Sequence, residues 1–242
     1  MARVLFPLPD KDFDVTEVAV PWRLLTDAGH TVVFATEQGA VPACDPLLLT
    51  GVLFGQLGAE PEPITFYRQM EQDPGFLAPL PWADVEPEDF GALLLGGGHA
   101  PGMRQYLGSE VLHDLVARFW ALERPVAAIC HGVLVLARCR DTATGEPLLA
   151  GTRTTCLPAY MELLAWGITA WKLGSYYRTY PETVQAEVEA TGAQFERGPI
   201  TLFTRGTADS DAGTFLVRDG RYVSGRWPGD SYALARDLIE RL

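Results

Sequence analysis

The sequence predicts an α/β fold with a doubly wound, mostly parallel sheet and helices on both faces. A helix-like stretch at 15–29 lies between strand-like stretches at 2–8 and 30–36, which is the pattern of a βαβ unit with a right-handed crossover. The apolar runs at 91–98 and 125–130 show no polar alternation, which is typical of strands buried on both faces. These features together indicate a three-layer sandwich.

The remaining elements extend this pattern through a chain that we expect to form one domain over residues 1–242. Ser109 is placed to cap a helix, and Asp219-Gly220 is typical of a hairpin turn. The proline-rich segment at about 37–90 is a long insertion with short helical stretches, and we expect it to act as a lid. Further strands are expected at 152–158, 200–205, 213–220 and 221–227, and further helices at 109–123, 159–166, within 174–192 and at 228–242.

Composition and charge exclude several classes of function. The 19 basic and 31 acidic residues give a formal net charge of −12, which opposes binding to nucleic acid. The apolar run at the start of the sequence is too short for a signal peptide, and no apolar run reaches the length of a membrane span. The four cysteines show no zinc-site spacing, so we expect free thiols, no bound metal and a cytoplasmic location.

Cys130 is the strongest candidate for a catalytic residue. It follows the apolar run 125–129 within AICHG, which matches the G-x-S-x-G nucleophile elbow with Cys in place of Ser. The helix that follows directs its amino end at the thiol, which predicts a pKa below the reference value of about 8.5. The other three cysteines, Cys44, Cys139 and Cys156, lack this context and are expected to be buried small side chains.

Two neighbouring motifs supply candidate partners for the thiol. His131 offers an imidazole for proton transfer and a backbone N–H for an oxyanion hole. The GGGHAPG stretch at 96–102 fits neither a dinucleotide fingerprint nor a P-loop, but the N–H groups of Gly97 and Gly98 are candidates for the other half of that hole. His99 is either a pocket residue or a polar residue of the turn.

Glu17 has two interpretations. The stretch from Asp14 to Glu17 resembles a capping box, in which Glu17 bonds back to the helix start. The same helix start lies at the carboxyl end of the first strand, on the rim that carries Cys130. There a carboxyl group can hydrogen-bond the thiol and hold a proton. Residue patterns alone do not choose between the two.

AAICHG, GGGHAPG and a glutamate early in the first helix together resemble the ThiJ/PfpI superfamily, which has a flavodoxin-like fold related to class I glutamine amidotransferases. The resemblance implies that Cys130 is the nucleophile and Glu17 a protonated carboxyl beside it, with Gly98 and His131 as backbone donors. The long segment 37–90 is closest to the chaperone-like glyoxalase III branch.

That branch carries an acid that orients the histidine, and Glu162 stands in its place within TTCLPAYMEL, although Ala159 stands where some relatives have Asp. An acidic residue of a neighbouring subunit is the alternative, and we expect a homodimer. The side chains of Tyr176, Tyr177, Arg178 and Tyr180 either line the pocket or form an aromatic packing patch.

The resulting functional hypothesis is an enzyme in which Cys130 adds to the aldehyde of a small 2-oxoaldehyde and releases a 2-hydroxy acid, without a cofactor or metal. The alternatives on the same fold are a cysteine hydrolase that cleaves an amide or peptide, and an isonitrile hydratase. An alternative of another class is a stress-response chaperone or a redox sensor, in which the cysteine is a switch. Turnover of small carbonyl compounds distinguishes these classes.

Overall fold

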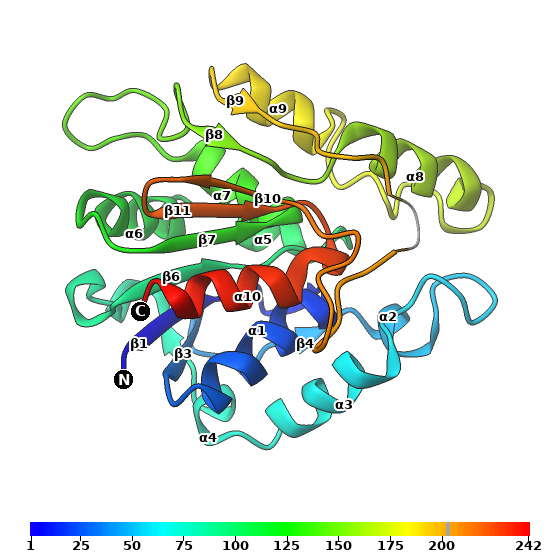
Figure 1. Cartoon of the computed structure of the whole chain (residues 1–242), viewed down its shortest axis with the longest axis horizontal. Coiled ribbons are helices and arrows are strands. Elements are labelled where there is room, and N and C mark those ends of the chain that lie inside the picture. Colours follow the sequence, from blue (N-terminus) through cyan, green and yellow to red (C-terminus); the bar gives the residue numbers. More distant parts are fainter. Residues whose placement is uncertain (202–203) are drawn as a thin grey trace.

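A seven-stranded sheet forms the centre of the protein, as the computed structural model shows for residues 1–201 and 204–242 (Figure 1). All neighbouring strands pair in parallel except β10 and β11 at one edge. This confirms the predicted mostly parallel sheet. In spatial order the strands are β10 (Leu216–Asp219), β11 (Tyr222–Gly225), β7 (Val126–Ile129), β6 (Ala92–Leu95), β1 (Arg3–Pro7), β3 (Thr31–Thr36) and β5 (Leu80–Pro81).

Helices cover both faces of this sheet (Figure 1). On one face, α1 (Val15–Asp27) packs against α10 (Ser231–Glu240), which also contacts β7 and β11. On the other face, α6 (Glu110–Ala121) packs against α7 (Val133–Arg138). The chain runs from β1 to β3 in one direction and from β6 through β7 to β11 in the other, so the switch point lies between β1 and β6.

Local sequence explains the central elements. Every residue of β6 and β7 is buried, as their continuous apolar runs predict. The Asp14 carboxylate caps α1 by accepting hydrogen bonds from the N–H groups of Thr16 and Glu17. The expected Ser109 cap of α6 and the hairpin between β10 and β11 are also confirmed.

Part of the insertion at 37–90 packs into the core. It contains β4 (Ala43–Cys44), α2 (Pro46–Thr50), α3 (Pro61–Met70), α4 (Pro74–Leu77) and the edge strand β5. Helix α3 packs on α1, and the indole N–H of the fully buried Trp82 donates to the Ala35 carbonyl at 3.0 Å. Phe76 packs edge-on against Phe34 with ring centroids 5.1 Å apart. These residues of the segment pack into the core, and the expected lid role of the insertion stays a prediction.

Smaller elements complete the fold. Two short parallel pairs lie outside the central sheet: β2 (Lys11–Phe13) with β4, and β8 (Arg153–Thr154) with β9 (Gln194–Phe195). Further helices are α5 (Met103–Leu107), α8 (Ala159–Leu173) and α9 (Val184–Ala190). Helix α8 is longer than predicted because its apolar sequence continues to Leu173. The strand expected at 200–205 includes two residues outside the described ranges, and its described residues are not in a strand. No helix within the described ranges has the length and apolar character needed to cross a bilayer.

Candidate active site

Three strand ends meet at the switch point of the sheet. The segment after β1 leads to Glu17, the segment after β6 contains Gly97, and Cys130 directly follows β7. A Cβ added to Gly97 would lie 2.7 Å from Glu17 Oε2, 2.8 Å from the His131 nitrogen and 3.0 Å from Cys130 Cβ. The structure therefore brings these four predicted residues together, and a side chain at Gly97 would not fit.

Cys130 has the backbone of a nucleophile elbow. Its φ angle is +56°, a left-handed conformation that costs energy for a residue with a side chain. The chain turns through Cys130–Gly132 directly into α7. A Cβ at Gly132 would lie 2.3 Å from the Leu95 carbonyl oxygen, so this glycine permits the close approach of the turn to β6.

Cys130 and His131 form a buried pair. The Cys130 Sγ lies 3.5 Å from the His131 Nδ1, and both residues are buried. Burial, followed by the charges of His99 and Arg138, lowers the pKa of His131 to about 3. The imidazole is therefore neutral near neutral pH, and its unprotonated ring nitrogen can accept a hydrogen bond.

Glu17 points into this site and not back to its helix start. Its Oε2 accepts a hydrogen bond from the Gly97 N–H at 2.9 Å. Its Oε1 has no hydrogen bond of good geometry in the described part of the chain, and the carboxyl group interacts with the Cys130 thiol. Burial, followed by the charge of Asp14, raises the pKa of Glu17 well above its usual range. The capping role belongs to Asp14.

The pKa of the thiol differs from our expectation. Burial raises the pKa of Cys130 well above its usual range, and the charge of Glu17 adds to this effect. The hydrogen bond from the His131 N–H acts in the opposite direction but is the smaller cause. The prediction of a pKa below about 8.5 is therefore wrong, because the amino end of α7 does not outweigh the desolvation of the thiol. The resting thiol keeps its proton.

The glycine turn after β6 contributes less to an oxyanion hole than expected. The Gly97 N–H is already bonded to Glu17. Gly98 has a φ of +150°, and its N–H has no acceptor within the described residues. Of the two glycine donors, the Gly98 N–H is thus the unoccupied one.

His99 lies near His131 and packs against two tyrosines. Its ring stacks on Tyr177 with centroids 4.2 Å apart and meets Tyr176 edge-on at 4.7 Å. The ring is 6.4 Å from that of His131, and burial lowers the pKa of His99 to about 3. The Tyr176 hydroxyl donates to Asp45 of the insertion. The three rings therefore pack against one another, and the pocket interpretation of His99 and of the two tyrosines stays a prediction.

The structure does not bring Glu162 to His131. The buried Glu162 carboxylate accepts from the Val184 N–H at 3.0 Å and lies 3.8 Å from the Arg178 guanidinium. The Nε2 of His131 instead faces the Thr179 hydroxyl at 3.2 Å. Thr179 was missed in the sequence, where a threonine within SYYRTYP carries no signal for such a role.

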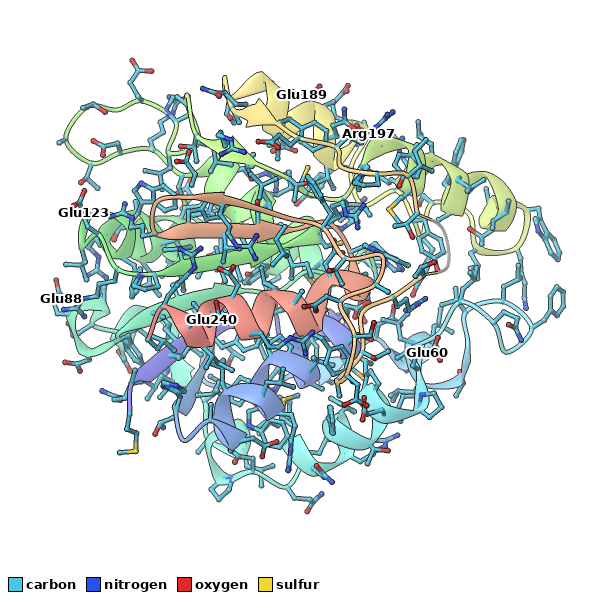
Figure 2. The ribbon with its side chains drawn as sticks, viewed as in Figure 1. Glu60, Glu88, Glu123, Glu189, Arg197 and Glu240 are labelled. Atoms are coloured by element: carbon cyan, nitrogen blue, oxygen red, sulfur yellow. The ribbon has the colours of Figure 1, made fainter. Side chains whose placement is uncertain are left out.

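The acidic residues divide into two groups by burial. Glu88, Glu123, Glu189 and Glu240 lie at the periphery of the molecule and are exposed (Figure 2). Glu17, by contrast, is fully buried. No group of three or more His, Cys, Asp or Glu side chains is arranged to hold a metal ion in the described ranges.

Comparison with known proteins assigns this architecture to a family. The model of the ThiJ/PfpI family-like proteins matches residues 8–199, which is most of the chain. The protein therefore belongs to the ThiJ/PfpI family, as its motifs predicted.

Three similarities illustrate this relationship. The chain is 25% identical over 240 residues to a deglycase of Pyrococcus abyssi, which covers 99% of both chains. It is 24% identical over 227 residues to glyoxalase 3 of Candida albicans, which covers 93% of this chain and 87% of the relative. The crystal structure of glyoxalase III from Candida albicans matches with a TM-score of 0.69 at 22% identity, over 99% of this chain and 97% of that chain, which shows a shared fold.

Proposed function

We propose that this protein is a cysteine-dependent enzyme that converts a small 2-oxoaldehyde into a 2-hydroxy acid. The observation that carries the proposal is the distance of 3.5 Å between the Sγ of Cys130, held in a nucleophile elbow, and the Nδ1 of a neutral His131. A thiol that keeps its own proton needs such a base to react. We expect the enzyme to act on small molecules as a cytoplasmic homodimer.

The first step forms a hemithioacetal. The Cys130 proton passes to Nδ1 of His131 while the sulfur bonds to the aldehyde carbon C1. The electron pair of the C1 carbonyl moves to its oxygen, which takes the proton back from the imidazolium. The neutral base is thereby restored in the addition, while the sulfur stays bonded to C1 until the C–S bond breaks.

The second step moves hydrogen from C1 to C2. His131 removes the proton from C1, and the C2 carbonyl oxygen receives a proton from the Glu17 carboxyl group, which gives an enediol. The C1 hydroxyl then returns its proton to Glu17 while C2 takes the proton from His131, which leaves a thioester of the 2-hydroxy acid. Water adds at C1, the C–S bond breaks and Cys130 regains its proton. The net reaction consumes one water and needs no oxidant.

The occupied Gly97 N–H favours this chemistry over amide or peptide hydrolysis. A hydrolase needs two donors aimed at a developing oxyanion. Here the Gly97 N–H group already bonds to Glu17. Relatives named glyoxalase 3 and deglycase add support for carbonyl chemistry.

Methylglyoxal turnover tests the proposal. The wild-type protein should convert methylglyoxal to lactate, identified by proton NMR, and Cys130→Ala should lose about a thousandfold or more of this rate. Cys139→Ala, which removes another buried thiol, is the matched control and should retain the rate. Absence of lactate, or full activity in Cys130→Ala, would contradict the proposal. Absence of turnover together with reversible oxidation of Cys130 would favour the redox sensor.

A further inference from the structure

His131 is held at both of its ring nitrogens. Its Nδ1 faces the Cys130 sulfur at 3.5 Å, and its Nε2 faces the Oγ1 of Thr179 at 3.2 Å. Thr179 lies between α8 and α9 and is 3% exposed. Solvent therefore has little access to the contact that decides which nitrogen carries the proton.

The Thr179 hydroxyl has a second contact that fixes its direction. Its Oγ1 lies 2.7 Å from the carbonyl oxygen of His99. A carbonyl oxygen accepts but cannot donate, and a hydroxyl group has one proton. The Thr179 proton therefore goes to His99, and the oxygen presents a lone pair to His131.

The tautomer of His131 follows from this arrangement. A neutral imidazole carries one N–H, and only a protonated Nε2 can donate to the Thr179 lone pair. Nδ1 is then unprotonated and accepts the S–H of Cys130. The opposite tautomer would place two acceptors against each other at Nε2.

We propose that Thr179 is the positioning residue that holds His131 in its Nε2–H tautomer, at the place where the family resemblance predicts a carboxylate. Its contribution to turnover rests on the proposed function, whereas the tautomer does not. A hydroxyl group at Nε2 orients the ring without a negative charge that would favour imidazolium. The resting pair is therefore a neutral thiol and a neutral imidazole.

Neighbouring residues hold Thr179 in place. The Arg104 Nε donates to the Thr179 carbonyl oxygen at 2.9 Å, and the His99 carbonyl holds the hydroxyl. Glu162 contacts the preceding Arg178 and the start of α9. Glu162 thus anchors the segment that carries Thr179, and it acts on the imidazole through that segment.

Nitrogen-15 NMR of histidine-labelled protein, combined with two variants, tests this role. The wild type should show a protonated Nε2 and an unprotonated Nδ1 on His131. Thr179→Val keeps the shape but removes the hydroxyl, so it should give a mixture of tautomers and reduce kcat for methylglyoxal about tenfold or more with little change in KM. Thr179→Ser should restore the tautomer and most of the rate.

Thr155→Val is the matched control, because Thr155 is also a buried threonine and its hydroxyl has no partner in the described structure. It should change neither the tautomer nor kcat. A protonated Nδ1 in the wild type would overturn the proposal even if Thr179→Val failed to fold. An unchanged tautomer in folded Thr179→Val would also overturn it. If the wild type has no turnover, the proposed function fails, but the two spectra still decide the role of Thr179.

Discussion

The Cys130 site and the Arg226–Asp230 cluster occupy matching positions at the same edge of the sheet. Strands β7 and β11 pair in parallel with Ile129 opposite Gly225, and each strand end is followed by a buried reactive or charged residue. One position holds Cys130 and the other holds Arg226. Because burial and location are shared, the two regions differ mainly in how completely their polar groups are paired.

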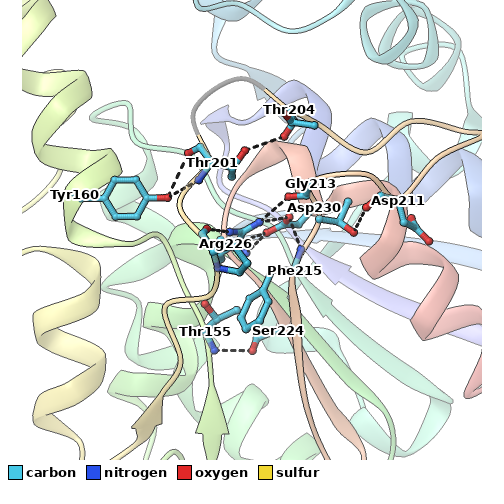
Figure 3. Close-up of polar contacts among 12 residues, drawn as sticks. Thr155, Tyr160, Thr201, Thr204, Asp211, Gly213, Phe215, Ser224, Arg226 and Asp230 are labelled. Carbon is cyan, nitrogen blue, oxygen red and sulfur yellow. Dashed lines mark hydrogen bonds and ion pairs between the residues drawn. The ribbon is translucent and has the colours of Figure 1, made fainter.

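The Arg226–Asp230 cluster is completely paired (Figure 3). The Arg226 Nε and Nη2 donate to the two Asp230 oxygens at 2.9 and 3.0 Å, and its remaining contacts are the carbonyl oxygens of Pro199 and Gly213 at 2.8 and 2.9 Å. Asp230 also accepts from the Phe215 N–H at 3.0 Å. These contacts hold Pro199 and the segment before β10 against the end of β11, so this cluster is structural.

The Cys130 site leaves groups without partners. Glu17 Oε1 and His99 Nε2 have no hydrogen bond within the described ranges, and Cys130 has a strained backbone. Buried polar groups normally find partners, so unpaired groups beside a strained nucleophile indicate a role beyond stability. The comparison teaches that burial alone does not identify a site, whereas incomplete pairing beside an elbow does.

Removing the positive charge of the structural cluster should have the largest effect on stability. Arg226→Leu leaves Asp230 buried without its partner, and we expect a loss of about 3 to 5 kcal/mol in the free energy of unfolding. The exposed Arg218, which pairs with Asp237, provides the control, and Arg218→Leu should lose less than about 1 kcal/mol. Urea unfolding measures both, and equal losses would break the distinction between the two regions.

Glu17→Gln should affect turnover and not stability, whereas Arg226→Leu should affect stability. The glutamine oxygen can still accept from the Gly97 N–H, but its amide cannot exchange a proton as an acid. We expect turnover to fall about a hundredfold while the melting temperature stays nearly unchanged. Glu162→Gln should reduce turnover less. Full activity in Glu17→Gln would remove Glu17 from the mechanism, and an equal loss in Glu162→Gln would place Glu162 at His131.

The pH dependence of stability should reveal the proton on Glu17. Its raised pKa means that the folded state binds more protons than the unfolded state above about pH 4.3, so Glu17 makes stability fall as pH rises. His131 and His99, with pKa values lowered to about 3 from 6.5, make stability rise with pH in the window between those values.

Glu17→Gln removes one opposing contribution, while that of Asp14, whose pKa burial raises to about 6, remains. The variant should steepen the rise in stability from about pH 5 to about pH 6.5, by at most about 1.4 kcal/mol per pH unit. Urea unfolding of both proteins across that window measures the slopes. Parallel slopes would show that the folded state does not hold an extra proton on Glu17.

The sequence was sufficient for the features that depend on local pattern. The apolar strands, the elbow at Cys130 and the position of Glu17 on the same rim all follow from residues near each other in the chain. The direction of the Cys130 pKa and the contact of Thr179 with His131 depend on packing between distant segments. Burial by several elements sets the pKa, and no short motif reports it. The likeness of Glu162 to an orienting acid came from spacing, which does not show where a helix points its side chain.

Competitive alkylation tests most directly that Cys130 is the reactive thiol. Its exposed fraction of 4% is close to the 5% of Cys44, so access does not favour it. Burial raises the pKa of all four thiols, that of Cys44 to about 12, but Cys130 has a neutral imidazole nitrogen at 3.5 Å to take its proton as the sulfur is alkylated. After brief iodoacetamide treatment of the folded protein, peptide mass spectrometry should find Cys130 labelled first. Earlier labelling of Cys44, Cys139 or Cys156 would contradict its assignment as the nucleophile.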